Sequence, residues 1–210
     1  MMKTRDNSKL KKWELALLLA LCLSLCAGMW AQREQRELAD KMIRLHVIAS
    51  SDSAEDQALK LEVRDLVLAR LRPLLKGKDS VEEARAAIEE FLPRLEEDAK
   101  RFLESRGADS RVAVTLGREY YPTRTYDSFS LPAGEYDSLR VILGEGRGEN
   151  WWCVVFPPLC VSVVQAEAAE ISGLDLDDVA LITEENEGYV LKFRIIELWS
   201  SLVSRIRGAR

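Results

Sequence analysis

The N-terminal part of the chain combines a basic stretch with an uncharged apolar run. Five lysine and arginine residues occur among the first 12 positions, and residues 15–31 contain no charged side chain. An amphipathic core helix would show a polar stripe, which this run lacks. A basic lead followed by such a run is typical of secretory signal segments. We therefore predict that residues 1–31 are a signal peptide or a signal anchor, and that the chain from residue 32 onward lies outside the membrane.

The body of the chain begins with a predicted helical stalk and a predicted strand, and two further helices are expected after them. Residues 32–41 are polar and predict a short helical stalk, and the β-branched run 42–49 predicts a strand. Two helices are expected after it, because apolar residues recur there at helical spacing. Their predicted buried stripes are Leu59, Val63, Leu66, Val67, Leu71 and Leu74 in the first, and Val81, Ala84, Ile88, Leu92, Leu95, Ala99, Phe102 and Leu103 in the second.

Capping signals mark the ends of these two helices. Either Asp52 with Glu55 or Ser53 with Asp56 can form a capping box at the first helix, and Ser80 with Glu83 can form one at the second. We expect Pro73 to end or bend the first helix and Pro93 to kink the second, because proline lacks the backbone donor. Gly107 is the expected C-cap.

The apolar period changes to that of strands after residue 111. Segments 112–116, 123–131, 138–143 and 151–156 predict strands, separated by Gly, Pro, Asp and Asn. We interpret the glycine-rich stretch 144–150 as a hairpin loop, because a strand follows it where a phosphate loop requires a helix. Residues 191–206 carry an apolar stripe that predicts a covering helix. The pattern predicts a two-layer α+β domain over residues 42–210, with a mostly antiparallel sheet covered by helices.

Composition narrows the function classes. The chain has 210 residues and a net charge of −5. The first 31 residues hold five basic and two acidic side chains, so the remaining body carries −8, which argues against nucleic acid as a partner. The chain contains one histidine, which excludes histidine-rich metal sites, and we expect no cofactor and no small-molecule substrate.

His46, in the first predicted strand, is the main candidate for chemistry. With Asp52 and either Cys153 or Cys160 it could form a hydrolase site, although no Gly-x-Ser-x-Gly motif accompanies it. A packed, hydrogen-bonded histidine is the structural alternative. A ligand-binding module outside the cytoplasm is a further alternative, for which no pocket is readable from the sequence.

Cys153 and Cys160 flank a Phe-Pro-Pro-Leu turn on the exported side of the membrane, where thiols tend to oxidise. A disulfide between them and a pair of small buried residues are both compatible with the sequence. Trp151 and Trp152 point to opposite faces if their segment is a strand. The exposed one could then contact a partner protein or be covered by the C-terminal helix.

Two stretches resemble the stage II sporulation protein R family of endospore-forming bacteria. They are Ile43-Arg-Leu-His-Val-Ile-Ala-Ser-Ser-Asp-Ser53, continued by Glu55-Asp-Gln-Ala-Leu-Lys-Leu-Glu-Val-Arg-Asp65, and Asn150-Trp-Trp-Cys-Val-Val-Phe-Pro-Pro-Leu-Cys160. Ser50 departs from the family pattern, which has Asn at this place. The order, the spacing and the Trp-Trp-Cys…Pro-Pro-Leu-Cys string make the match specific.

The resemblance implies a signalling protein rather than an enzyme. Such a protein is made in the forespore and exported to the space between the forespore and mother-cell membranes. There it activates a membrane-embedded aspartic protease, which removes the pro-sequence of the early mother-cell sigma factor. For the contact with that protease we consider Ser51, Asp52, Asp56 and Gln57 together with Trp151 and Trp152. The alternative is that these residues only cap a helix and pack.

Overall fold

The computed structural model describes residues 12–108, 111–126 and 129–158. The predicted helix at 191–206 and Cys160 lie outside the described residues. The elements in chain order are α1 (Lys12–Asp40), β1 (Ile43–Ile48), α2 (Ala54–Leu75), α3 (Val81–Ser105), β2 (Val112–Tyr121), β3 (Arg124–Thr125), β4 (Ser130–Leu131), β5 (Gly134–Leu143) and β6 (Asn150–Phe156).

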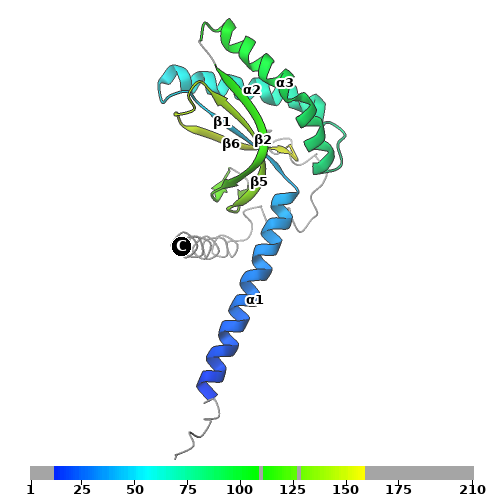
Figure 1. Ribbon diagram of the computed structural model, residues 1–210, viewed down its shortest axis with the longest axis vertical. Helices are drawn as coiled ribbons and strands as arrows, with labels where there is room; N and C mark the ends of the chain where they lie inside the picture. The colour runs from blue at the N-terminus through cyan, green and yellow to red at the C-terminus, as the bar shows by residue number, and fades with distance from the viewer. Residues whose placement is uncertain (1–11, 109–110, 127–128, 159–210) are drawn as a thin grey trace, which may run out of the picture.

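The main sheet has the strand order β2-β5-β1-β6, and β3 pairs with β4 separately (Figure 1). β1 and β5 are parallel, whereas β2–β5 and β1–β6 are antiparallel. The predicted α+β class with a mostly antiparallel sheet is therefore confirmed. The hairpin interpretation of residues 144–150 is wrong, because β1 lies between β5 and β6. The loop instead crosses the end of β1, where Gly148 N donates to Ala49 O at 2.9 Å and Arg147 N donates to Ser50 O at 3.2 Å.

Helices α2 and α3 cover one face of this sheet. The alternation of β1 places Ile43, Leu45 and Val47 on that face, where they are fully buried. The helices bring apolar stripes close to the predicted ones, of which Val63, Val67, Leu71, Ala84, Ile88, Leu95, Ala99 and Leu103 are buried. The contact between these stripes and the strands forms the main hydrophobic core.

The helix ends lie at or next to the predicted residues, but the C-cap of α3 is Arg106 and not Gly107. Ser53 is the N-cap of α2 and Ser80 that of α3, each accepting from the backbone N–H three residues later. Gly107 follows α3 with φ +71, and Ala108 N donates to Leu103 O at 3.1 Å, which is a Schellman closure. Pro73 and Pro93 both lie within their helices. Pro73 therefore does not end α2, which continues for two more residues to Leu75.

A smaller core lies against the opposite face of the sheet. The end of α1 and the residue after the following turn contribute Leu38, Ala39 and Met42, which are buried with Tyr136 of β5. The segment 123–131, predicted as one strand, forms the two-residue strands β3 and β4 beside this core. Only part of the second sheet face is thus covered by apolar packing, which leaves room for polar residues on it.

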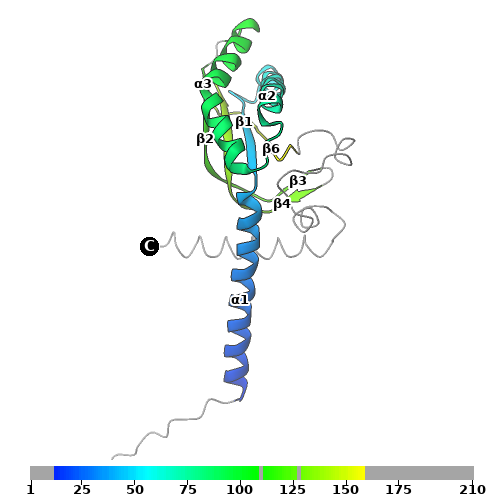
Figure 2. The same cartoon turned by 90° about the vertical axis from the view of Figure 1, so that its right-hand side faces the viewer.

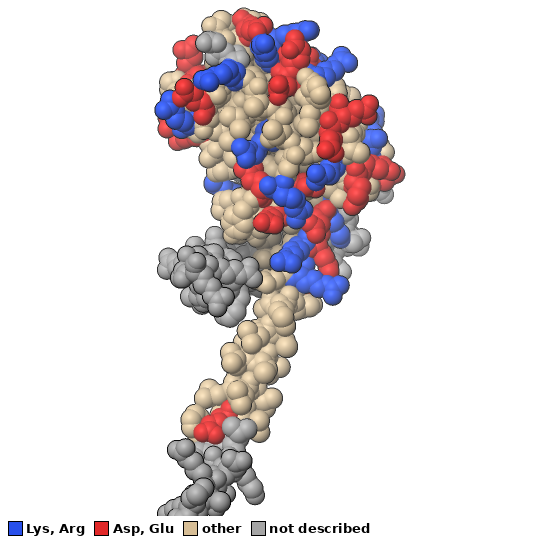
Figure 3. All heavy atoms as spheres, viewed as in Figure 1, with Lys and Arg blue, Asp and Glu red and all other residues tan. Residues whose placement is uncertain are grey.

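Helix α1 is continuous from the apolar run into the domain. Its 29 residues include the stretch predicted as a separate stalk, so it is about 43 Å long at 1.5 Å per residue. By length and composition it could cross a membrane. Figures 1 and 2 show it as a single rod leaving the domain, and Figure 3 shows a shaft with few charges below a domain of mixed charge.

Candidate functional site

A row of polar and aromatic side chains crosses the sheet face that α2 and α3 do not cover. The register pairs His46 with Arg140 on one side and with Trp152 on the other, and pairs Arg140 with Thr115. Directly paired residues point to the same face of a sheet. His46 therefore occupies the middle of a row that runs through all four strands, on the face opposite the main core.

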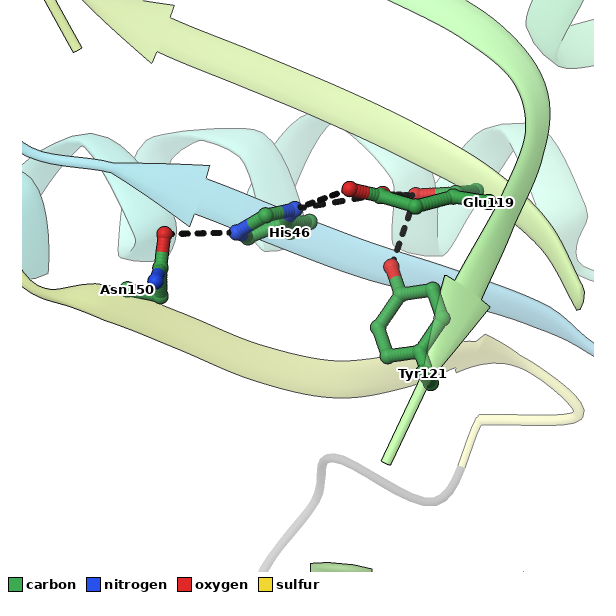
Figure 4. A network of polar contacts seen from close by, with 5 residues as sticks. His46, Glu119, Tyr121 and Asn150 are labelled. Carbon is green, nitrogen blue, oxygen red and sulfur yellow. Dashed lines mark hydrogen bonds and ion pairs between the residues drawn. The ribbon is translucent and has the colours of Figure 1, made fainter. Parts of the chain in front are cut away.

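His46 is held by an acceptor at each ring nitrogen (Figure 4). Its Nδ1 lies 3.0 and 3.1 Å from the two carboxylate oxygens of Glu119, and its Nε2 lies 2.8 Å from Oδ1 of Asn150. The Trp152 ring stacks against the imidazole with centroids 5.4 Å apart. His46 is only 6% exposed, so these contacts fix its ring orientation.

Glu119 links the histidine to a buried hydroxyl pair. Ser138 Oγ donates to Glu119 Oε2 at 2.7 Å, and the Tyr121 hydroxyl lies 2.6 Å from Ser138 Oγ. Ser138 and Tyr121 are each 1% exposed, whereas the Glu119 side chain is 22% exposed. The Glu119 carboxylate therefore accepts hydrogen bonds from two buried groups, Ser138 Oγ and His46 Nδ1. Both are too buried to find water as an acceptor instead.

Arg44 lies beside this network on the same face and is fully buried. Its guanidinium carbon is 3.9 Å from the centroid of the Tyr121 ring and 4.8 Å from that of Tyr136, and Nη2 donates to the Tyr126 hydroxyl at 2.8 Å. Nε and Nη1 have no hydrogen-bond partner in the described residues. Aromatic faces thus take the place of a carboxylate in stabilising this buried cation.

Burial raises the pKa values of the Tyr121 and Tyr136 hydroxyls well above the ordinary tyrosine value. For Tyr121 the hydrogen bond with Ser138 opposes this shift, and for Tyr136 the charge of Arg44 does. Loss of water is the larger effect in both cases. The two hydroxyls therefore stay protonated in the folded protein.

We expect these tyrosines to limit stability in alkali. The unfolded chain releases their protons near pH 10, whereas the folded chain keeps them, so stability is complete below about pH 10 and falls above it. The loss is up to about 1.4 kcal/mol per pH unit for each tyrosine. Urea unfolding between about pH 8 and 11 measures the slope. A slope that the pair Tyr121→Phe and Tyr136→Phe leaves unchanged would contradict this assignment.

The geometry does not assemble the hydrolase site considered from the sequence. Asp52 is turned away from His46, and its Oδ1 accepts from Glu149 N at 2.7 Å. Cys153 pairs with Leu45, on the opposite face from His46, and is disulfide-bonded. Glu119 orients the imidazole as a carboxylate orients a general base, but no described hydroxyl or thiol is hydrogen-bonded to Nε2. The partner of Cys153 is outside the described residues, so the pairing with Cys160 stays a prediction.

The turn before α2 uses the polar groups that the sequence offered as contact candidates. Ser51 Oγ donates to Asp56 Oδ2 at 2.5 Å, and Gln57 Nε2 donates to Ser51 O at 2.9 Å. Lys60 Nζ donates to Gln57 Oε1 at 2.5 Å and to Glu149 O at 3.1 Å. Together with Asp52, these bonds tie the turn to the crossing loop 144–150.

The two tryptophans lie on opposite faces of β6, as the strand pattern predicted. Trp151 packs beside the main core, with the Arg64 guanidinium 4.9 Å from its ring centroid. Trp152 lies on the face that α2 and α3 leave uncovered, which we call the open face. Its ring lies between His46 and the guanidinium of Arg124, whose carbon is 3.8 Å from the Trp152 ring centroid. The sequence-predicted contact residues therefore do not share one surface: the turn lies near Trp151, and Trp152 lies with His46.

Glu119, Ser138, Asn150 and the arginines around His46 were not recognised as site residues from the sequence. A usable signal was present in β1, where Arg44 and His46 alternate with apolar residues and thus share the face opposite the core. The strand pairing that brings Glu119 to His46, 73 positions earlier in the chain, has no local signal.

The part of the chain that holds this network also matches a known protein family. The profile of the family described as Stage II sporulation protein R matches residues 39–166, which include every residue of the His46 network. Stage II sporulation protein R of Bacillus subtilis (strain 168) is 36% identical over 197 residues, covering 83% of this chain and 88% of that protein. No solved structure matches this chain.

Proposed function

Because this chain belongs to the stage II sporulation protein R family, we propose that it is an exported signalling protein. In this proposal it is made in the forespore and crosses the forespore membrane by its N-terminal segment. It then activates a membrane-embedded aspartic protease that processes the precursor of the early mother-cell sigma factor. The chain acts as a binding partner rather than as an enzyme.

Family membership over most of the chain is the observation that carries this proposal. It is supported by α1, which is apolar and long enough to cross a membrane and which buries Leu38 and Ala39 of its last turn in the domain. An anchor joined to the domain without a loose linker would hold the domain at a defined height above the membrane. It is also supported by His46, whose partners orient it without a nucleophile among the described residues.

Activation requires only that the chain bind the active arrangement of the protease more tightly than the inactive one. A tenfold shift of that equilibrium takes about 1.4 kcal/mol of differential binding. Candidate contacts are the turn at Ser51, Asp52, Asp56 and Gln57 with Trp151 beside it. Trp152 would belong to a separate contact on the open face.

Co-expression in a non-sporulating host tests the proposal. The full chain, the membrane protease and a tagged sigma precursor would be produced together, and cleavage would be followed by gel mobility. We expect cleavage only when this chain is present. An intact precursor, with all three proteins folded and in place, would remove the main support for an activator.

The same assay separates a structural His46 from a catalytic one. In His46→Gln we expect any loss of cleavage to follow the loss of folded protein, because Gln cannot fill both the Glu119 and the Asn150 contacts. Folded protein would be measured by urea unfolding and by resistance to limited proteolysis. Full stability with complete loss of cleavage would instead show that His46 acts in binding or in chemistry rather than in folding, and would reopen the hydrolase alternative.

A further inference from the structure

The open face of the sheet carries arginines without carboxylate partners. Arg140 adjoins His46 in the sheet row, and Arg124 stacks on Trp152 at the other side of the histidine. Each is half-buried, and each has a buried Nε without a hydrogen-bond partner in the described residues. No ion pair joins either one, or the buried Arg44 beside them, to an acidic residue of the described chain.

This distribution is unusual for the chain as a whole. The protein has a net charge of −5, and most arginines with described ion pairs lie on helices or loops outside this face. Glu119 is the acidic group within the network, and it is engaged by His46 and Ser138. A half-buried guanidinium without an ion-pair partner is most stable when a carboxylate or phosphate pairs with the part of it that stays exposed.

We propose that this surface, formed by Arg124, Arg140 and Trp152 around the buried His46, binds a short acidic segment of a protein partner. The proposal rests on the proposed function, which supplies the protein partner. It places the contact with that partner on the open face of the sheet. Arg124 and Arg140 pair with side-chain carboxylates of the segment, and Trp152 on the edge strand β6 supplies the apolar part of the contact.

Charge favours a short acidic peptide over other polyanions. A nucleic acid or an anionic membrane presents many charges over a long distance, and the net negative charge of this chain repels such surfaces. Two or three arginines act only within about 10 Å at ordinary salt.

Binding of a fluorescent octaglutamate peptide to the full chain in nonionic detergent tests the surface directly. Fluorescence anisotropy would compare the wild type with the double variant Arg124→Glu and Arg140→Glu. The control is Arg94→Glu, an exposed arginine of α3 whose described contact is the Phe91 ring. We expect the double variant to bind at least about tenfold more weakly, and the control to bind as the wild type does.

Three results would overturn the proposal. They are no binding by the wild type, equal binding by all variants, and binding of soluble dihexanoyl phosphatidylglycerol, but not octaglutamate, that depends on the two arginines. The co-expression assay distinguishes a failure of this contact surface from a failure of the proposed function. If wild type drives cleavage but the double variant drives it equally well, only the contact surface is wrong. If wild type itself drives none, the proposed function fails, and the peptide measurement still decides the surface.

Discussion

Replacing Gly148 by alanine is expected to lower the free energy of unfolding by about 3 kcal/mol. Gly148 lies where the loop 144–150 crosses the end of β1. A Cβ placed there would overlap the carbonyl oxygen of Ser51 and lie 2.6 Å from the Ser51 carbonyl carbon and 2.9 Å from the Ala49 Cβ. These atoms belong mostly to the backbone, so relief requires the loop to move and to lose the Gly148–Ala49 hydrogen bond.

Urea unfolding followed by tryptophan fluorescence measures this loss, with Gly117→Ala as the matched control. Gly117 lies in β2, and a Cβ there meets no atom within 4 Å. Alanine at this place should be neutral or slightly stabilising, because it restricts the unfolded chain. Equal losses in the two variants would show that close approach of the two loops is not the reason for glycine at 148.

Removal of the Glu119 carboxylate should have an effect of similar size. In Glu119→Ala, the buried Ser138 hydroxyl and the Nδ1 of His46 lose their acceptor, and Tyr121 loses the chain of bonds beyond Ser138. Each unsatisfied buried group costs about 1–3 kcal/mol, so we expect a loss of about 3 kcal/mol in the free energy of unfolding.

Two further variants serve as the comparison and the control for this measurement. Glu119→Gln keeps one acceptor oxygen and should recover part of the loss, whereas Glu135→Ala, at an exposed position of β5, should change stability by no more than about 0.5 kcal/mol. A Glu119→Ala variant as stable as Glu135→Ala would show that the network contributes nothing to folding. The role of His46 would then have to be sought in binding or chemistry.

Local signals in the sequence were enough to place the helices. Ser53 and Ser80 cap them because a side-chain oxygen can reach the backbone N–H three residues later, and Gly107 closes α3 because glycine adopts positive φ without strain. The apolar run before residue 32 likewise identified the membrane-compatible helix. Its continuation to Asp40 was not foreseen as part of one helix, since it is fixed by the packing of Leu38 and Ala39 against the domain.

Residues near one another in the chain were thus enough to predict the apolar N-terminal helix, helices α2 and α3, most strands and the α+β class, and two short motifs indicated the family. Three features became apparent only in the folded domain: β1 lies between β5 and β6, β1 and β5 run parallel, and Glu119 and Asn150 meet His46. The alternation of a strand sets which residues share a face. Which strand lies next to it depends on contacts between distant segments, and these form only when the whole domain packs.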